Sequence, residues 1–253
     1  MLLNGKVAVV FGAGGAVGGA VARQFAEEGA TVFLSDRTPT SVEDVQRAIV
    51  AKGGAAHVAQ VDATSESDVE GYLAEVAGRA GAPDVVLNAI GIQAVQGVPL
   101  LELSLADFVS PITTWASSQF LTSRIAGRHM VQRGSGAILT LSASPATLAI
   151  AGTGGFAVAC ASVEALSRTL AAELGPAGVR VVCVRPHRIA ETVDAPDLPM
   201  PDAEFRAFLE GMTLLKRLPS LSDVARTAAF LASDGAAAMS GSVVNLTCGM
   251  SVG

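Results

Sequence analysis

The chain has 253 residues, 50% of them hydrophobic and 16% charged, which suits a single domain with a large apolar core. Its net charge of −6, with no run of Lys and Arg, argues against a nucleic acid as partner. Three widely spaced cysteines (Cys160, Cys183 and Cys248) fit neither a disulfide framework nor a metal site, so we expect no metal ion and a reducing, cytoplasmic location.

Short runs of β-branched and aliphatic residues alternate with longer helical patterns along the chain. Strands are predicted within residues 6–12, 30–36, 55–62, 84–91, 136–143, 179–186 and 242–247, with helices between them. The strands are apolar almost throughout, as strands covered on both faces should be. Gly29, Gly53, Gly81 and Gly175 stand where helices should end. This alternation of strands and helices predicts an α/β fold with a parallel sheet.

The first strand is followed by the glycine-rich stretch FGAGGAVGG. Gly12, Gly14, Gly15 and Gly18 would let the backbone turn tightly and bring helix amides close to a pyrophosphate; a turn needed only for packing is the alternative. With a nearby lysine and the sequence AVA, this region also has features of a secretory leader. So many glycines make a poor continuous helix, however, and no segment has the roughly 20 apolar residues of a membrane span. We expect neither a leader nor a membrane anchor.

The second predicted strand ends at Asp36, where a carboxylate would accept hydrogen bonds from an adenosine ribose. Asp36 would repel a 2′-phosphate on that ribose, although Arg37 could offset this by pairing with it, so NAD is preferred to NADP. A solvated turn is the alternative interpretation of both residues.

In their order along nearly the whole chain, these motifs resemble those of the short-chain dehydrogenase/reductase family. FGAGGAVG at 11–18 is similar to the family's T-G-x-x-x-G-x-G, with Phe11 for Thr and Ala16 for the middle Gly. VDAT at 61–64 resembles the segment beside the adenine, and LNAIGI at 87–92 resembles N-N-A-G. The resemblance implies one Rossmann-like domain over 1–253, a doubly wound parallel sheet of about seven strands with helices on both faces, and assembly as a dimer or tetramer. It assigns NAD binding to Gly12, Gly14, Gly15, Val17, Gly18, Asp36, Arg37, Asp62, Ala63, Asn88, Gly91 and Pro186.

The catalytic residues of that family have no counterparts here. Members use a Tyr phenol as proton donor, a Lys four residues later that lowers the phenol pKa, a Ser and an Asn. By the flanking sequence GFAVACASVEAL, Phe156 takes the Tyr position and Cys160 the Lys position. Ala143 falls at the Ser position and Trp115 near the Asn position, with Thr113 or Thr114 as alternatives. No shift restores the pair, because the chain's one tyrosine is Tyr72 and its lysines are Lys6, Lys52 and Lys216.

Other polar side chains near the strand ends are weak candidates for a replacement chemistry. His187 stands for a family Gly after Pro186, which would put an imidazole near the nicotinamide, and a loop histidine is the alternative. Ser144 could replace the missing Ser by a shift of one residue, or be a turn hydroxyl. Arg188 and Glu191 lie close by in sequence. Cys160 lacks a neighbouring cation and is expected to be a packing residue rather than a nucleophile; His57 and His129 are expected to be structural.

Three functions stay open. The first is a non-catalytic or regulatory subunit that binds NAD(H), as a homo-oligomer or with a complete family member. The second is an enzyme of unusual mechanism, by proton transfer, cyclisation or elimination. The third is an oxidoreductase whose proton comes from substrate, water or a neighbouring chain. Phe156, Trp115 and Ile90 favour a small apolar ligand, and the proline-rich segment 190–205 is expected to form a substrate loop or lid.

Overall fold

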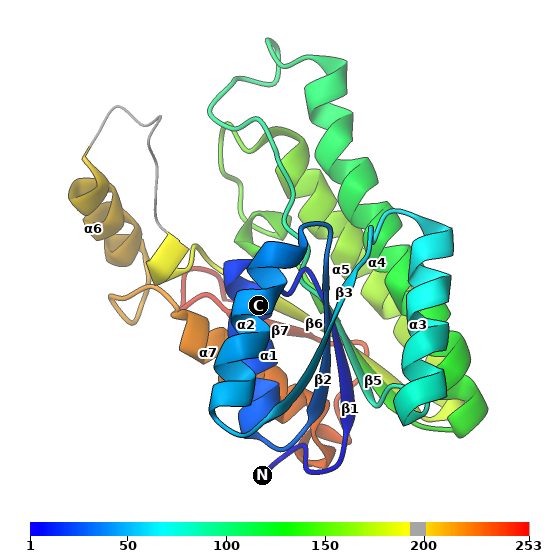
Figure 1. The fold of residues 1–253 in the computed structure, drawn as a ribbon. Coiled ribbons are helices and arrows are strands. Elements are labelled where there is room, and N and C mark those ends of the chain that lie inside the picture. The colour runs from blue at the N-terminus through cyan, green and yellow to red at the C-terminus, as the bar shows by residue number, and fades with distance from the viewer. Residues whose placement is uncertain (193–200, 253) are drawn as a thin grey trace.

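A computed structural model describes residues 1–192 and 201–252 of the chain (Figure 1). In the described residues, seven parallel strands form one sheet with the order β3-β2-β1-β4-β5-β6-β7. The chain winds outward from β1 to β3, then returns to β4 on the other side of β1 and winds to β7. This confirms the expected doubly wound α/β fold.

Every strand lies within a segment that the sequence predicted. The strands are β1 (Val7–Phe11), β2 (Thr31–Asp36), β3 (Ala55–Gln60), β4 (Val85–Asn88), β5 (Gly136–Leu141), β6 (Val179–Pro186) and β7 (Val243–Leu246). The α-helices are α1 (Ala16–Glu27), α2 (Pro39–Ala51), α3 (Glu66–Ala80), α4 (Leu105–Arg133), α5 (Gly154–Leu174), α6 (Asp202–Met212) and α7 (Leu221–Ala232). Gly29, Gly53, Gly81 and Gly175 lie at or just beyond the ends of α1, α2, α3 and α5, as expected.

Helices cover both faces of the sheet. Helices α1, α2 and α7 lie on one face, and α3, α4 and α5 lie on the other (Figure 1). Successive side chains of β1 point to opposite faces, so Ala8 and Val10 enter the first core while Val9 and Phe11 enter the second. Because both faces are buried, the central strands are apolar at nearly every position.

The expected lid falls partly on regular structure. Segment 190–205 begins with the short 3-10 turn Ala190–Thr192 and ends in the first residues of α6. Residues 193–200 lie outside the described residues, so the lid stays a prediction.

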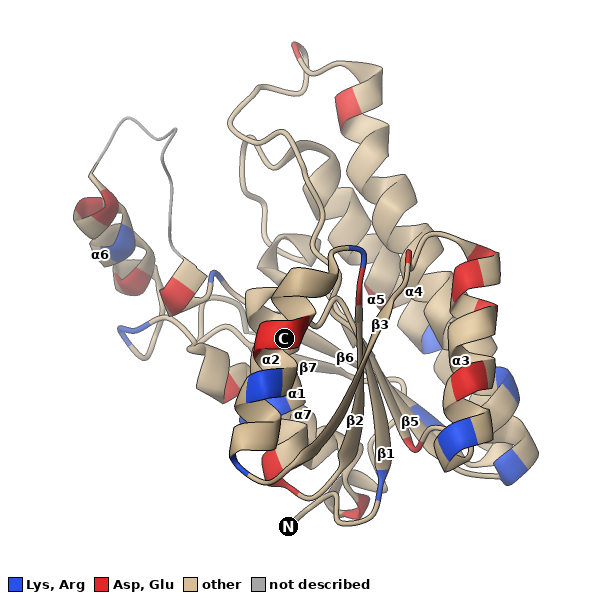
Figure 2. Cartoon of the chain, in the orientation of Figure 1, with Lys and Arg blue, Asp and Glu red and all other residues tan. Residues whose placement is uncertain are grey.

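Charged residues are interspersed over the helices rather than separated by sign (Figure 2). Arg124 and Arg128 of α4, for example, pair with Glu66 and Glu70 of α3. Within residues 1–192 and 201–252, every helix is too short or too polar to cross a membrane.

Candidate functional site

The glycine turn joins the carboxyl end of β1 to α1, beside the point where the strand order reverses. Gly12 has a φ of 73°, and a Cβ there would lie 2.6 Å from the carbonyl oxygen of Ala89. A Cβ on Gly18 would collide with the carbonyl oxygen of Gly12. Helix α1 has no side-chain cap and no acidic residue in its first turn, so its first amides are available to an anion. The turn therefore fits a diphosphate group.

The carboxylate of Asp36 lies directly beside this turn. Its Oδ2 accepts a hydrogen bond from the amide of Gly14 at 3.2 Å, and its Oδ1 accepts one from Thr38 at 3.3 Å. Backbone amides, rather than Arg37, therefore hold the carboxylate. The negative charge at the end of β2 is thus kept in place for a ribose hydroxyl.

A pocket connects the two features. It is lined by Phe11, Gly12, Ser35, Asp36, Arg37, Val61, Asp62, Ala63, Thr64, Ile90, Gly91 and Thr114. Six of the expected cofactor residues are among them. Asp62 accepts a hydrogen bond of 2.6 Å from the Thr64 hydroxyl, which lowers the pKa of that carboxyl and keeps it ionised. The pocket thus brings the carboxylates of Asp36 and Asp62 to the same side as the glycine turn.

The other expected cofactor residues, Gly14, Gly15, Val17, Gly18, Asn88 and Pro186, lie outside this lining. The glycines shape the turn. Asn88 points into the protein: its Nδ2 donates to the Thr122 hydroxyl at 3.0 Å, and its Oδ1 accepts from the amide of Ile90 at 3.1 Å. Asn88 therefore holds the end of β4 against α4.

An apolar cluster occupies the positions where the resemblance implies catalytic residues. The rings of Trp115 on α4 and Phe156 on α5 have centroids 5.6 Å apart. The Trp115 indole donates to the carbonyl oxygen of Ile90 at 3.0 Å, which fixes the ring. Cys160 is fully buried in the same cluster, and burial raises the pKa of its thiol to about 12. The thiol is therefore a neutral packing group, as expected.

Ser144 and His187, which the sequence suggested separately, are in contact. Ser144 follows β5 and His187 follows the adjacent strand β6; the Ser144 Oγ and the His187 Nδ1 are 2.8 Å apart. Their residues are 2% and 8% exposed. Burial lowers the pKa of His187, and the charge of Arg188 lowers it further, so the imidazole is neutral near pH 7. Its Nε2 is buried and has no hydrogen-bond partner among the described residues.

A buried ion pair lies deeper between α5 and β6, and the sequence analysis missed it. Glu164 and Arg185 are 6% and 4% exposed, and their carboxylate and guanidinium approach to 3.5 Å. The hydroxyl of Ser142 donates to the same carboxylate at 2.9 Å. An arginine within the apolar strand VVCVRP, together with a glutamate one helical turn after Cys160, was the available signal.

Two further titratable side chains, of Tyr72 and His57, pack against aromatic rings. Tyr72 packs edge-on against Phe11, and burial raises the pKa of its phenol. His57 lies against the ring of Phe33. No cluster of His, Cys, Asp and Glu in residues 1–192 and 201–252 could hold a metal ion.

Comparison with known proteins extends over almost the whole chain. A family model described as Enoyl-(Acyl carrier protein) reductase matches residues 12–251. Cis-4-hydroxycyclohexanecarboxylate dehydrogenase of Sinomonas cyclohexanicum is 34% identical over 239 residues, 94% of each chain. The (2S)-[(R)-hydroxy(phenyl)methyl]succinyl-CoA dehydrogenase subunit BbsD of Thauera aromatica is 31% identical over 100% of this chain and 99% of its own. The solved structure of NAD⁺-bound xylitol dehydrogenase, 24% identical, superposes with a TM-score of 0.90 over 97% of this chain and 99% of its own.

Proposed function

Because the chain belongs to the short-chain dehydrogenase/reductase family, we propose that it is a non-catalytic or regulatory subunit that binds a nicotinamide dinucleotide. The observation that carries this proposal is the apolar cluster of Trp115, Phe156 and Cys160, which stands where the resemblance implies the proton donor and its ammonium. The glycine turn and Asp36 retain the shape and charge for the cofactor. The chain would thus bind the dinucleotide without catalysing hydride transfer.

The glycine turn and Asp36 support NAD(H) over NADP(H). When bound, a nicotinamide dinucleotide supplies a hydride donor or acceptor. The first amides of α1 would hold the diphosphate, and Asp36 would accept hydrogen bonds from the adenosine ribose. A 2′-phosphate would meet the Asp36 carboxylate, whose two oxygens already accept from backbone amides.

The cluster of Trp115, Phe156 and Cys160 lacks the proton path that the family uses. Phenylalanine has no acidic hydrogen, and a buried neutral thiol at position 160 cannot lower the pKa of a neighbouring acid. Loss of general acid-base catalysis alone costs about 10²–10⁴ in rate. The apolar wall instead suits a small apolar ligand in the crevice.

Such a subunit could function by assembling with a family member that keeps the catalytic Tyr, Lys and Ser. The relative from Thauera aromatica is named as one subunit of a dehydrogenase, so a chain of this family can be one component of such an enzyme. We propose the same arrangement here, in the cytoplasm, with a homo-oligomer as the alternative.

Calorimetry and turnover on the purified chain test the proposal together. NADH should bind more tightly than NADPH, while a broad panel of carbonyl and alcohol substrates should give no turnover above background. A relative that keeps Tyr, Lys and Ser is the positive control. Turnover at an enzymatic rate by the chain alone would refute a non-catalytic role, and absence of dinucleotide binding would refute the cofactor assignment.

The contact between Ser144 and His187 favours a second candidate, an enzyme of unusual mechanism in the same crevice. Ser144 would fix the imidazole through Nδ1, leaving Nε2 to accept or donate a proton. Such an enzyme could carry out a proton transfer or an atypical hydride transfer. If any turnover is found, His187→Ala should abolish it; unchanged turnover in that variant would exclude His187 as the acid or base.

A further inference from the structure

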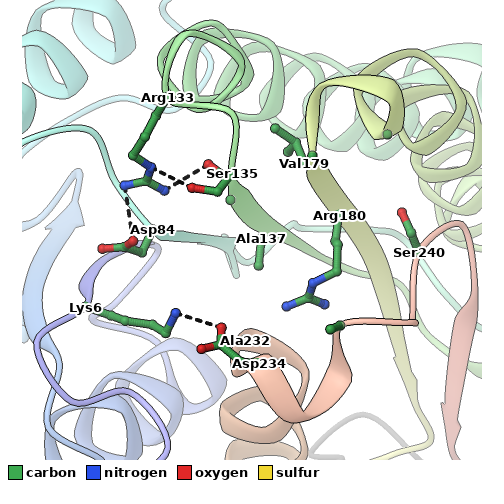
Figure 3. A pocket seen from close by; sticks show the side chains of 14 residues that line it. Lys6, Asp84, Arg133, Ser135, Ala137, Val179, Arg180, Ala232, Asp234 and Ser240 are labelled. Carbon is green, nitrogen blue, oxygen red and sulfur yellow. Dashed lines mark hydrogen bonds and ion pairs between the residues drawn. The ribbon is translucent and has the colours of Figure 1, made fainter.

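A second cavity, of about 410 Å³, opens at the opposite end of the sheet, at the amino ends of the strands (Figure 3). Gly136 and Val179, the first residues of β5 and β6, form part of its wall. Lys6 and Asp84, which immediately precede β1 and β4, form another part. The cavity therefore lies away from the dinucleotide pocket, which is at the carboxyl ends of the strands. Its volume is within the range of small-molecule sites.

The charges that line this cavity do not balance. Lys6, Arg133 and Arg180 face it, together with two carboxylates, Asp84 and Asp234. Each carboxylate is already paired: the Lys6 ammonium lies 3.0 Å from Asp234, and the Arg133 guanidinium lies 3.1 Å from Asp84. One positive charge is left over.

That charge is on Arg180, whose guanidinium points into the cavity (Figure 3). Its hydrogen-bond partners in residues 1–192 and 201–252 are two backbone carbonyl oxygens, of Ser233 at 3.1 Å and of Met239 at 3.4 Å. A guanidinium has five N–H donors, so these contacts leave donors for a ligand. Burial lowers the pKa of Arg180, and the nearby carboxylate of Asp234 offsets part of that effect.

We propose that this cavity is a second binding site, for a small molecule that bears a carboxylate or phosphate group. The planar guanidinium of Arg180 pairs with either oxyanion through two parallel hydrogen bonds. Lys6 is the second cation within reach, because its partner Asp234 has a side chain 90% exposed and such a surface pair is weak. Glycine and alanine residues in the lining, including Gly178 and Ala237, leave room for the body of the ligand.

Calorimetric titration of the intact protein at constant ionic strength tests this site. Inorganic phosphate and succinate are the two probes, and the one that binds more tightly identifies the class of oxyanion. Arg180→Leu should weaken its binding roughly ten- to a hundredfold, the effect of one charge-assisted hydrogen-bonding group. Arg128→Leu, which removes an exposed arginine of α4 outside the cavity, should leave binding unchanged.

If neither probe binds at concentrations up to about 10 mM, the binding free energy is too small for a built site, and the proposal is overturned. Equal affinity in Arg180→Leu would overturn it as well. Should that variant fail to fold, Ala237→Leu narrows the cavity from an exposed position without removing a charge, and unchanged affinity there would decide against the site. NADH binding is measured in the same samples. Its absence would count against the proposed function and not against this second site.

Discussion

Cys160 is the residue that the family resemblance aligns with a lysine, and its surroundings explain why the thiol cannot replace an ammonium. It is fully buried, and its pKa is raised to about 12 by that burial. We predict that Ellman's reagent at pH 8 modifies one thiol of the folded protein, the half-buried Cys248, and all three in denaturant. Cys248→Ser should remove the reaction of the folded protein. Rapid modification of Cys160 in the folded protein would contradict the assignment.

Asp36 is expected to set the choice between the two dinucleotides. Its carboxylate is fixed beside Gly14, where the adenosine ribose would lie. Asp36→Ala removes the repulsion of a 2′-phosphate, so NADPH affinity should rise while NADH affinity falls, each by up to about tenfold. Calorimetry with both nucleotides measures the change. Glu66→Ala, on the exposed surface of α3, is the control, and a wild-type preference for NADPH would show the prediction to be wrong.

The buried imidazole of His187 makes stability depend on pH. Its pKa in the folded state is lowered, so between that pKa and its ordinary value near 6.5 the unfolded chain binds a proton that the folded chain does not. Stability therefore falls as pH drops through 6.5. From pH 7.5 to 5.5, the advantage of wild type over His187→Gln in free energy of unfolding should shrink by up to about 1.4 kcal/mol.

Urea titration at the two pH values measures this difference. His57 and His129 are present in both proteins, so their contributions cancel in the comparison. Ser144→Ala keeps the imidazole and should keep the pH dependence. A constant difference between wild type and His187→Gln would mean that the folded-state pKa of His187 is not lowered.

At the scale of elements, the wall of the crevice depends on the close approach of α4 and α5. Gly155, in the first turn of α5, is where they meet: a Cβ there would collide with the carbonyl oxygen of Phe108 and lie 3.0 Å from Pro111. Gly155→Ala should therefore lower the free energy of unfolding by roughly 1–3 kcal/mol. Gly71→Ala on α3 is the matched control, because its Cβ meets open space and should stabilise the helix by up to about 1 kcal/mol. Thermal and urea unfolding compare the two.

At the scale of the whole molecule, periodicity predicted the strands and a parallel sheet, whereas the doubly wound arrangement was implied by the family resemblance. Strands buried on both faces read as unbroken apolar runs, and glycines mark the helix ends, so both signals are local in sequence. The turn at Gly12 and the acid at Asp36 were predictable for the same reason. Their relative placement follows from the parallel pairing of β1 with β2.

The polar contacts across elements could not be predicted in this way. Ser144 and His187 are brought together by the pairing of β5 with β6, and Glu164 meets Arg185 only when α5 packs on that strand. The cavity around Arg180 forms from segments at several strand ends. These arrangements depend on tertiary packing, which no window of residues contains.

If the chain binds the dinucleotide but does not catalyse, as we propose, its behaviour in an assembly follows. Mixed with a family member that keeps Tyr, Lys and Ser, the chain should form a mixed oligomer, detected by native mass spectrometry, whose turnover depends on the partner's tyrosine. Phe156→Tyr in this chain should not raise that turnover. The new phenol would lack the ammonium, because Cys160 remains, so nothing would lower its pKa toward neutrality. A gain of activity from Phe156→Tyr alone would mean that the crevice still holds a working proton path.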